Sequence, residues 1–320
     1  MRMADLYRKD RSSPNIIRRM VSPESSPLLY LVGTLIFLGV FIAYPIVRVF
    51  YMSLMHNVLT RPDQGIYFVG IQNFISLFQN PDFLMTLNRT IGWTLLSVAG
   101  KAGIGFIIAL LLLNITRGKK LFIFLLFIPW VTPNVVGAIT WRWIFDGQFG
   151  MLNWLLLKAH LLSQPVSWLS SNLYAFLFTA MVDMWVGIPF MAIVFMGGLQ
   201  TVPLETLESA DIDGAGYFQK LLLIRIPIIA PIVLVATTLS AIWTFNSFQI
   251  VWPLTKGGPV AATETLIIKA YKLAFGAFDI GSSSAVAVII FLVLFLFSIF
   301  YNQKLGQAER RGGKSIAAAK

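Results

Sequence analysis

Cysteine is absent from this chain, and charged residues are scarce. Without a single thiol among 320 residues, no disulfide, thiol nucleophile or thiolate metal site can form. Histidine is almost as rare: His56 and His160 stand alone, and neither belongs to an HExxH helix that would bind zinc. These absences exclude the common thiol and zinc chemistries.

Two further absences bear on catalysis. The chain contains no GxxxxGK[ST] loop to hold nucleotide phosphates, so ATP chemistry must belong to another protein. It also contains no GxSxG nucleophile elbow. A membrane enzyme acting on lipid or glycan would need a nucleophile, a base or a metal cluster, and the sequence offers none of these. We therefore predict a chain that is not an enzyme.

What the chain has instead is apolar length. Apolar residues make up 57% of the sequence and charged residues 12%, against about 45–50% and about 25% in soluble domains. Several runs reach about 20 residues, enough for a helix to cross a hydrocarbon core about 30 Å thick. The runs are continuous rather than alternating, which favours helices over a barrel. We predict an all-α integral membrane protein with six spans, over residues 28–50, 90–114, 121–145, 173–199, 228–252 and 281–303.

Lysine and arginine are distributed unevenly about these spans. If the N-terminus is cytoplasmic, the inner side carries sixteen cations, six in 1–27, three in 115–120, two in 200–227 and five in 304–320, and the outer side carries seven. The positive-inside rule therefore puts both termini in the cytoplasm, with tails 1–27 and 304–320 flanking one transmembrane domain, 28–303. Because this topology accounts for the net charge of +11, we expect no nucleic-acid partner.

Two charges fall inside the predicted spans, at Lys101 and Asp183. A charge at the bilayer centre costs about 2.5–3.5 kcal/mol on insertion scales, so each should face protein or water. Both lie about ten residues from the outer end of their spans, or about 15 Å deep in a helix, and can pair with each other. A structural ion pair is one interpretation; a proton relay and a contact to an anionic substrate are the alternatives.

The fifth predicted span is unusually polar toward its outer half. Spacings of three and four place one face along this span, with Asn246 beside it; the face consists of Thr237, Ser240, Trp243 and Ser247. Hydroxyls and amides can replace water around a polar solute while an indole stacks on its apolar face. Alternatively, these side chains only bond neighbouring helices. The candidates for a substrate path are Trp243, Asn246, Ser247 and Gln249.

The segment ETLESADIDGAGYFQKLLLIRIP, residues 205–227, gathers four of the fourteen acids within nine residues. We predict a helix over 204–211 and a second over 217–224, with a turn at Gly214 and Gly216 between them and a stop at Pro227. The topology above places this segment in the cytoplasm. A short, acidic, hinged helical element there can insert into a groove of a soluble protein.

The spacing from Glu208-Ser209-Ala210 through Gly214 to IRIP at 224–227 resembles the EAA loop of membrane subunits of binding-protein-dependent ABC importers. Ser209 stands where alanine is usual, and Ile226 where leucine is frequent. Three longer stretches resemble the carbohydrate-uptake branch, which includes the maltose and glycerol-3-phosphate permeases. They are FIPWVTPNVVGAITWRWIFDGQFGMLNWLL, WVGIPFMAIVFMGGLQTVPLETLESADIDGAG and WTFNSFQIVWPLTKGGPVAATETLIIKAYKLAF.

This resemblance implies a type I ABC importer (MetI-like) permease fold of six transmembrane helices, in which the first helix wraps the partner permease and the other five form the core. It implies a bacterial inner-membrane location. The expected partners are a second permease in a heterodimer, two cytoplasmic ATPase subunits, an extracytoplasmic solute-binding protein, and a sugar or oligosaccharide. ATP and magnesium would bind to the ATPase subunits, and no cofactor to this chain.

The resemblance also implies a role for the loop 201–227, which would couple the permease to the ATPase. Glu208 would meet a basic residue of the ATPase, and Gly214 would permit a hinge. The implied coupling residues are Glu205, Glu208, Ser209, Ala210, Asp213 and Gly214.

For the substrate, the resemblance makes the WTFNSF stretch part of the sugar path. Lys101 matches no motif and hints at an anionic cargo, such as a uronate oligosaccharide or a sugar phosphate. The alternative to an ATP-driven importer is a proton-coupled secondary carrier that uses Lys101 and Asp183.

Overall fold

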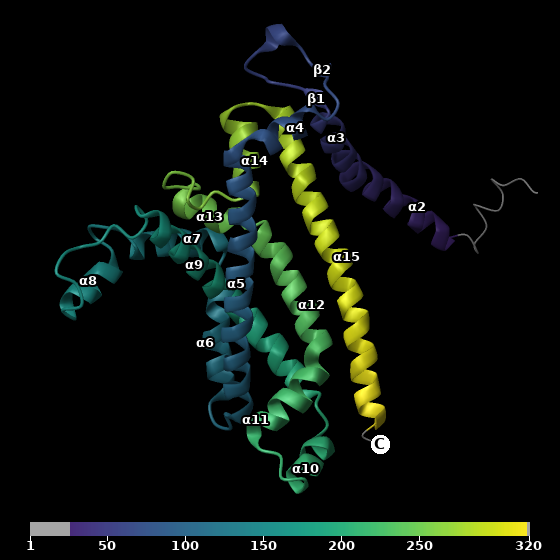
Figure 1. Cartoon of the computed structure of the whole chain (residues 1–320), viewed down its shortest axis with the longest axis vertical. Helices are drawn as coiled ribbons and strands as arrows, with labels where there is room; N and C mark the ends of the chain where they lie inside the picture. Colours follow the sequence, from purple (N-terminus) through teal and green to yellow (C-terminus); the bar gives the residue numbers. More distant parts are fainter. Residues whose placement is uncertain (1–25, 319–320) are drawn as a thin grey trace, which may run out of the picture.

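The structure, a computed structural model, describes residues 26–318. The predicted N-terminal tail, 1–27, falls almost entirely outside these residues. The described chain is helical apart from turns, loops and one short antiparallel pair, β1 (Met55–His56) with β2 (Tyr67–Phe68). Figure 1 shows an elongated bundle with this pair at one end and two short helices, α10 and α11, at the other.

Five helical stretches among residues 26–318 are long and apolar enough to cross a membrane. The first combines α2 (Ser26–Leu38), a π-helical segment (Gly39–Ala43) and α3 (Tyr44–Ser53). The other four are α5 (Pro81–Asn114), α9 (Asn172–Gln200), the stretch Tyr217–Phe245 and the apolar part of α15 (Ile280–Ala318).

The sixth candidate crossing among residues 26–318 is a bent pair, α6 (Lys119–Val131) and α7 (Asn134–Ile144), whose axes differ by 94°. The expectation of one continuous span over 121–145 is therefore wrong in shape. The bend falls at Thr132, which is extended (φ −67°, ψ 127°), because Pro133 disfavours the helical conformation in the residue before it.

Helix α5 begins at residue 81 rather than at the expected residue 90. The Asn80 side chain accepts a hydrogen bond of 2.9 Å from the Asp82 N–H, and Pro81 occupies the first turn. Asparagine at the N-cap, proline at the first helical position and an acid in the first turn form a start signal. The extra turns carry α5 beyond the predicted membrane boundary.

The predicted stop at Pro227 is also wrong. The second helix of loop 201–227, α11 (Tyr217–Lys220), continues through a π-helical segment (Leu221–Arg225) into α12 (Ile226–Phe245). Proline lacks an N–H and crowds the preceding turn, and the wider π turn gives the ring room. The predicted fifth span, 228–252, is instead interrupted after Phe245, and α13 (Phe248–Thr255) follows the break.

Shorter elements connect these helices, and one of them, α8, projects from the bundle in Figure 1. They are a 3₁₀ turn (Pro62–Gln64), α4 (Gln72–Gln79), α8 (Met151–Lys158), α10 (Leu204–Ile212), α14 (Leu266–Tyr271) and a π-helical segment (Lys272–Gly276).

The centre of the bundle is the packing of α5, α9 and α12. A β-carbon on Gly105 of α5 would come within 2.6 Å of the Met191 Cβ on α9, so only glycine permits this close approach of the two helices. Phe195 and Ile229 are buried in the cluster that joins α9 to α12. By contrast, α3 packs against α15 at the edge, and the described side chains of α2 are exposed.

Candidate functional site

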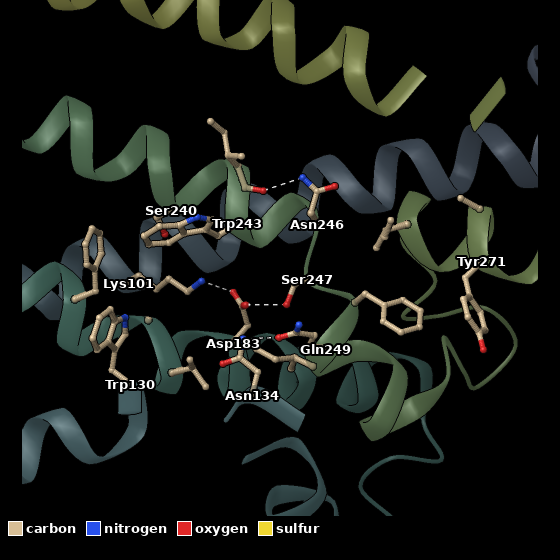
Figure 2. A pocket seen from close by; sticks show the side chains of 18 of the residues that line it. Lys101, Trp130, Asn134, Asp183, Ser240, Trp243, Asn246, Ser247, Gln249 and Tyr271 are labelled. Atoms are coloured by element: carbon tan, nitrogen blue, oxygen red, sulfur yellow. Dashed lines mark hydrogen bonds and ion pairs between the residues drawn. The ribbon is translucent and has the colours of Figure 1, made fainter. Parts of the chain in front are cut away.

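A cavity of about 900 Å³ lies where α5, α9, α12 and α13 meet. This volume is within the range of about 300–1,000 Å³ that is usual for ligand pockets. All four candidate substrate-path residues, Trp243, Asn246, Ser247 and Gln249, line it. The two intramembrane charges, Lys101 and Asp183, line it as well. Figure 2 shows these residues around the same space.

The break between α12 and α13 presents the polar groups to the cavity. Asn246 (φ −100°, ψ 23°) and Ser247 (φ −74°, ψ 60°) leave the helical conformation. The Asn246 side-chain N–H donates to the Ile242 carbonyl at 3.1 Å, which satisfies an acceptor at the helix end. The side-chain oxygen of Asn246 (Oδ1) and the side-chain nitrogen of the exposed Gln249 (Nε2) remain available to a solute.

The two charges form an ion pair: Lys101 Nζ lies 2.5 Å from Asp183 Oδ2. Both residues are 4% exposed. The ammonium also donates to Thr244 Oγ1 at 2.7 Å, and Ser247 Oγ donates to Asp183 Oδ1 at 3.2 Å. The pair therefore contributes no net charge to the cavity, and the hydroxyls of Thr244 and Ser247 hydrogen-bond to it.

The predicted polar face of the fifth span does not continue as one helical face, because α12 ends at Phe245. Ser240 lines the cavity, but Thr237 shares a hydrogen bond of 3.1 Å with Tyr301 on α15. Thr237 therefore serves helix packing, which was the alternative interpretation of the polar face.

The lining residues missed from the sequence include Trp130, Asn134 and Tyr271. Asn134 is the first residue of α7, and its amide donates to Gln249 Oε1 at 3.3 Å. An amide within a predicted span is a signal for a polar interior and could have pointed to Asn134. Trp130 and Tyr271 gave no comparable signal, because aromatic residues are common at membrane boundaries.

At the opposite end of α9 and α12, loop 201–227 forms a compact protrusion (Figure 1). Gly214 takes a left-handed conformation (φ +77°), which glycine adopts without strain, and it separates α10 from α11. Lys220 and Asp211 form an ion pair across this turn. The loop is therefore an ordered helix–turn–helix.

The candidate coupling residues lie on this protrusion. Ala210 is half-buried, whereas the other five, Glu205, Glu208, Ser209, Asp213 and Gly214, are exposed. Apolar side chains accompany them: Ile212 is 89% exposed and Leu204 is 67% exposed. On the inner side, Leu207 packs against the cluster that joins α9 to α12.

Known proteins resemble this chain in sequence. Residues 101–310 match the model of the binding-protein-dependent transport system inner membrane component family. A probable ABC transporter permease protein of Brucella suis biovar 1 (strain 1330) is 33% identical over 86% of this chain and 94% of its own length. The trehalose/maltose transport system permease protein of Thermococcus litoralis is 31% identical over 85% of this chain and 90% of its own length.

A solved structure resembles the fold. A chain from a bacterial ABC transporter involved in the import of the acidic polysaccharide alginate superposes with a TM-score of 0.75 at 19% identity, covering 91% of this chain and 97% of that chain. The expected type I importer permease fold and inner-membrane location are thereby confirmed. This chain belongs to the family of binding-protein-dependent transport system inner membrane components, as a multi-pass ABC transporter permease.

Proposed function

We propose that this permease forms half of the path by which a sugar or oligosaccharide is imported, in an ATP-driven transporter supplied by an extracytoplasmic solute-binding protein. The observation that carries the proposal is the cavity at the α12–α13 break. Its amides and hydroxyls match the hydroxyls of a sugar, and the half-exposed Trp243 offers an apolar face for a sugar ring. The trehalose/maltose permease among the relatives supports the same cargo class.

The ion pair favours an uncharged cargo. Asp183 compensates Lys101 inside the cavity, so an anionic sugar would have to compete with a buried carboxylate for the ammonium. A uronate oligosaccharide or a sugar phosphate is therefore the second candidate.

Loop 201–227 is the proposed docking element for a cytoplasmic ATPase. Exposed acids beside the exposed Ile212 and Leu204 suit a groove that is apolar inside and basic at its rim. We assign to Glu208 a basic partner on the ATPase. Asp211 has Lys220 as a partner within the loop.

The remaining subunits follow from this role. ATP and magnesium bind to the pair of ATPase subunits, this chain performs no catalysis, and a second permease completes the path. The arrangement requires both termini of this chain in the cytoplasm, on the same side as loop 201–227.

The test is uptake into proteoliposomes. The permease is reconstituted with a second permease, an ATPase and a solute-binding protein, and uptake of labelled maltose, a digalacturonate and a sugar phosphate is compared. We expect ATP-dependent uptake of the neutral disaccharide, with no uptake when the ATPase is omitted.

Two results would overturn the proposal. Uptake driven by a proton gradient in the absence of ATP would favour a secondary carrier that uses Lys101 and Asp183. ATP-dependent uptake of none of the three sugars, with uptake of a different solute class, would contradict the sugar assignment.

A further inference from the structure

The stem of Lys101 crosses the surface of α9 at a single glycine. A β-carbon on Gly187 would lie 2.6 Å from Lys101 Cε and 2.7 Å from Cδ, closer than carbon atoms pack at about 3.5–4.0 Å. Gly187 follows Asp183 by one helical turn, so α9 supplies both the groove for the stem and the carboxylate for the ammonium.

The paired charges reach the end of α12 from two sides. Lys101 Nζ donates to the Thr244 hydroxyl at 2.7 Å, and that hydroxyl donates to Asp183 Oδ2 at 3.3 Å. On the same helix as Lys101, Trp93 Nε1 donates to the Thr244 carbonyl at 3.1 Å. Helix α5 therefore holds Thr244 by its side chain and by its backbone.

The other side of the break is held by the second carboxylate oxygen. Ser247 Oγ donates to Asp183 Oδ1 at 3.2 Å, so one carboxylate bridges Thr244 before the break and Ser247 after it. Figure 2 shows Lys101 and Ser247 pointing toward the Asp183 carboxylate from opposite sides. Asn246 lies between these two fixed points, and Gln249 follows in the first turn of α13.

We propose that Lys101 and Asp183 are positioning residues that fix the α12–α13 break and thereby set the orientation of Asn246, Ser247 and Gln249 toward the cavity. The expected effect on sugar uptake rests on the proposed function, whereas the expected effect on the conformation of the α12–α13 break does not. The pair acts through the residues that it holds, and a neutral sugar need not touch either charge.

The absence of cysteine provides a direct reporter of the break. Gln249→Cys places the only thiol of the chain on the cavity side. Ser163→Cys, at an exposed residue after α8 and outside both the cavity and loop 201–227, provides a matched control. The measurement is the rate of modification by a hydrophilic methanethiosulfonate reagent, in the purified transporter complex without sugar.

Two variants separate positioning from folding. Lys101→Met keeps the length of the side chain but leaves Asp183 buried without its partner. Lys101→Met combined with Asp183→Leu removes both charges, a replacement that is often neutral or stabilising for a buried pair. In both variants we expect the thiol introduced by Gln249→Cys to react at least fivefold faster, while the thiol introduced by Ser163→Cys reacts at an unchanged rate.

Maltose uptake supplies the second measurement. In the double variant we expect KM to rise about tenfold while kcat stays within about twofold, because the cargo contacts are misplaced and the coupling loop is intact. If the Gln249→Cys thiol reacts equally fast with and without the Lys101–Asp183 pair, the positioning role is overturned. If its reaction is faster without the pair but the wild-type complex transports no sugar, the positioning role stands and the proposed cargo fails.

Discussion

Replacing Gly187 by alanine tests whether the Lys101 stem needs the groove on α9. The new β-carbon would lie 2.6 Å from Lys101 Cε, so the lysine must shift and draw its ammonium away from Asp183. Such overpacking costs about 1–3 kcal/mol. Alanine in a helix interior also gains about 0.5–1 kcal/mol over glycine, which offsets part of that cost.

Gly197→Ala is the matched control. Gly197 is on the same helix, and a β-carbon there would meet no atom within 4 Å. It should show only the helix-propensity gain. We therefore expect Gly187→Ala to be less stable than Gly197→Ala by about 1–3 kcal/mol, seen as a lower melting temperature of the purified transporter in detergent.

A double-mutant cycle shows whether the cost comes from the lysine. In a Lys101→Ala background the stem is absent, so adding Gly187→Ala should produce no further loss, and the coupling energy should equal most of the single-mutant cost. Equal melting temperatures for the two glycine variants, or the same cost with and without the stem, would refute the groove.

Three further outcomes are expected. Glu208→Lys and Gly214→Pro should abolish ATPase stimulation without preventing membrane insertion. The first reverses a docking charge, and the second puts proline where the backbone needs φ +77°, which proline cannot adopt. Normal uptake by both variants would contradict docking through this loop. Asn246→Leu with Gln249→Leu should raise the KM for sugar about tenfold, from two lost hydrogen bonds of about 0.5–1.5 kcal/mol each, while the ATPase still co-purifies. Glu264→Gln, at a 5% exposed residue paired with Lys269 and Lys272, should lower the melting temperature by a few degrees and leave ATPase stimulation unchanged.

The pairing of Lys101 with Asp183 was within reach of the sequence, because two isolated charges in apolar spans need partners and lie at similar depth. The contacts that fix the geometry of the pair could not be predicted from the sequence. The glycine groove, the bridging by Thr244 and the hydrogen bond from Ser247 depend on how closely α5, α9 and α12 approach. That approach is a property of the packed bundle and leaves no local pattern.

Helix breaks were the least predictable part of the fold. Pro133 bends the third span, yet Pro129 lies inside α6 and Pro189 inside α9, and both helices continue. Proline therefore marks a position where a bend is tolerated, and the neighbouring helices decide whether it occurs. The break after Phe245 has neither glycine nor proline within it and is held by tertiary hydrogen bonds, which no propensity scale records.

Helices α9 and α12 join the cavity to loop 201–227. Asp183 and Gln200 both belong to α9, and 17 residues of helix separate them by roughly 26 Å. Helix α12 runs from the second half of the loop to the residue before the break, and Leu207 packs where α9 and α12 meet. If α10 receives motion from an ATPase, as we propose, packed helices rather than flexible linkers carry it toward the cavity. The Lys101–Asp183 pair and Thr244 tie α5 and α9 to the end of α12, so a relative shift of these helices would strain that network and reorient the amides that face the cargo.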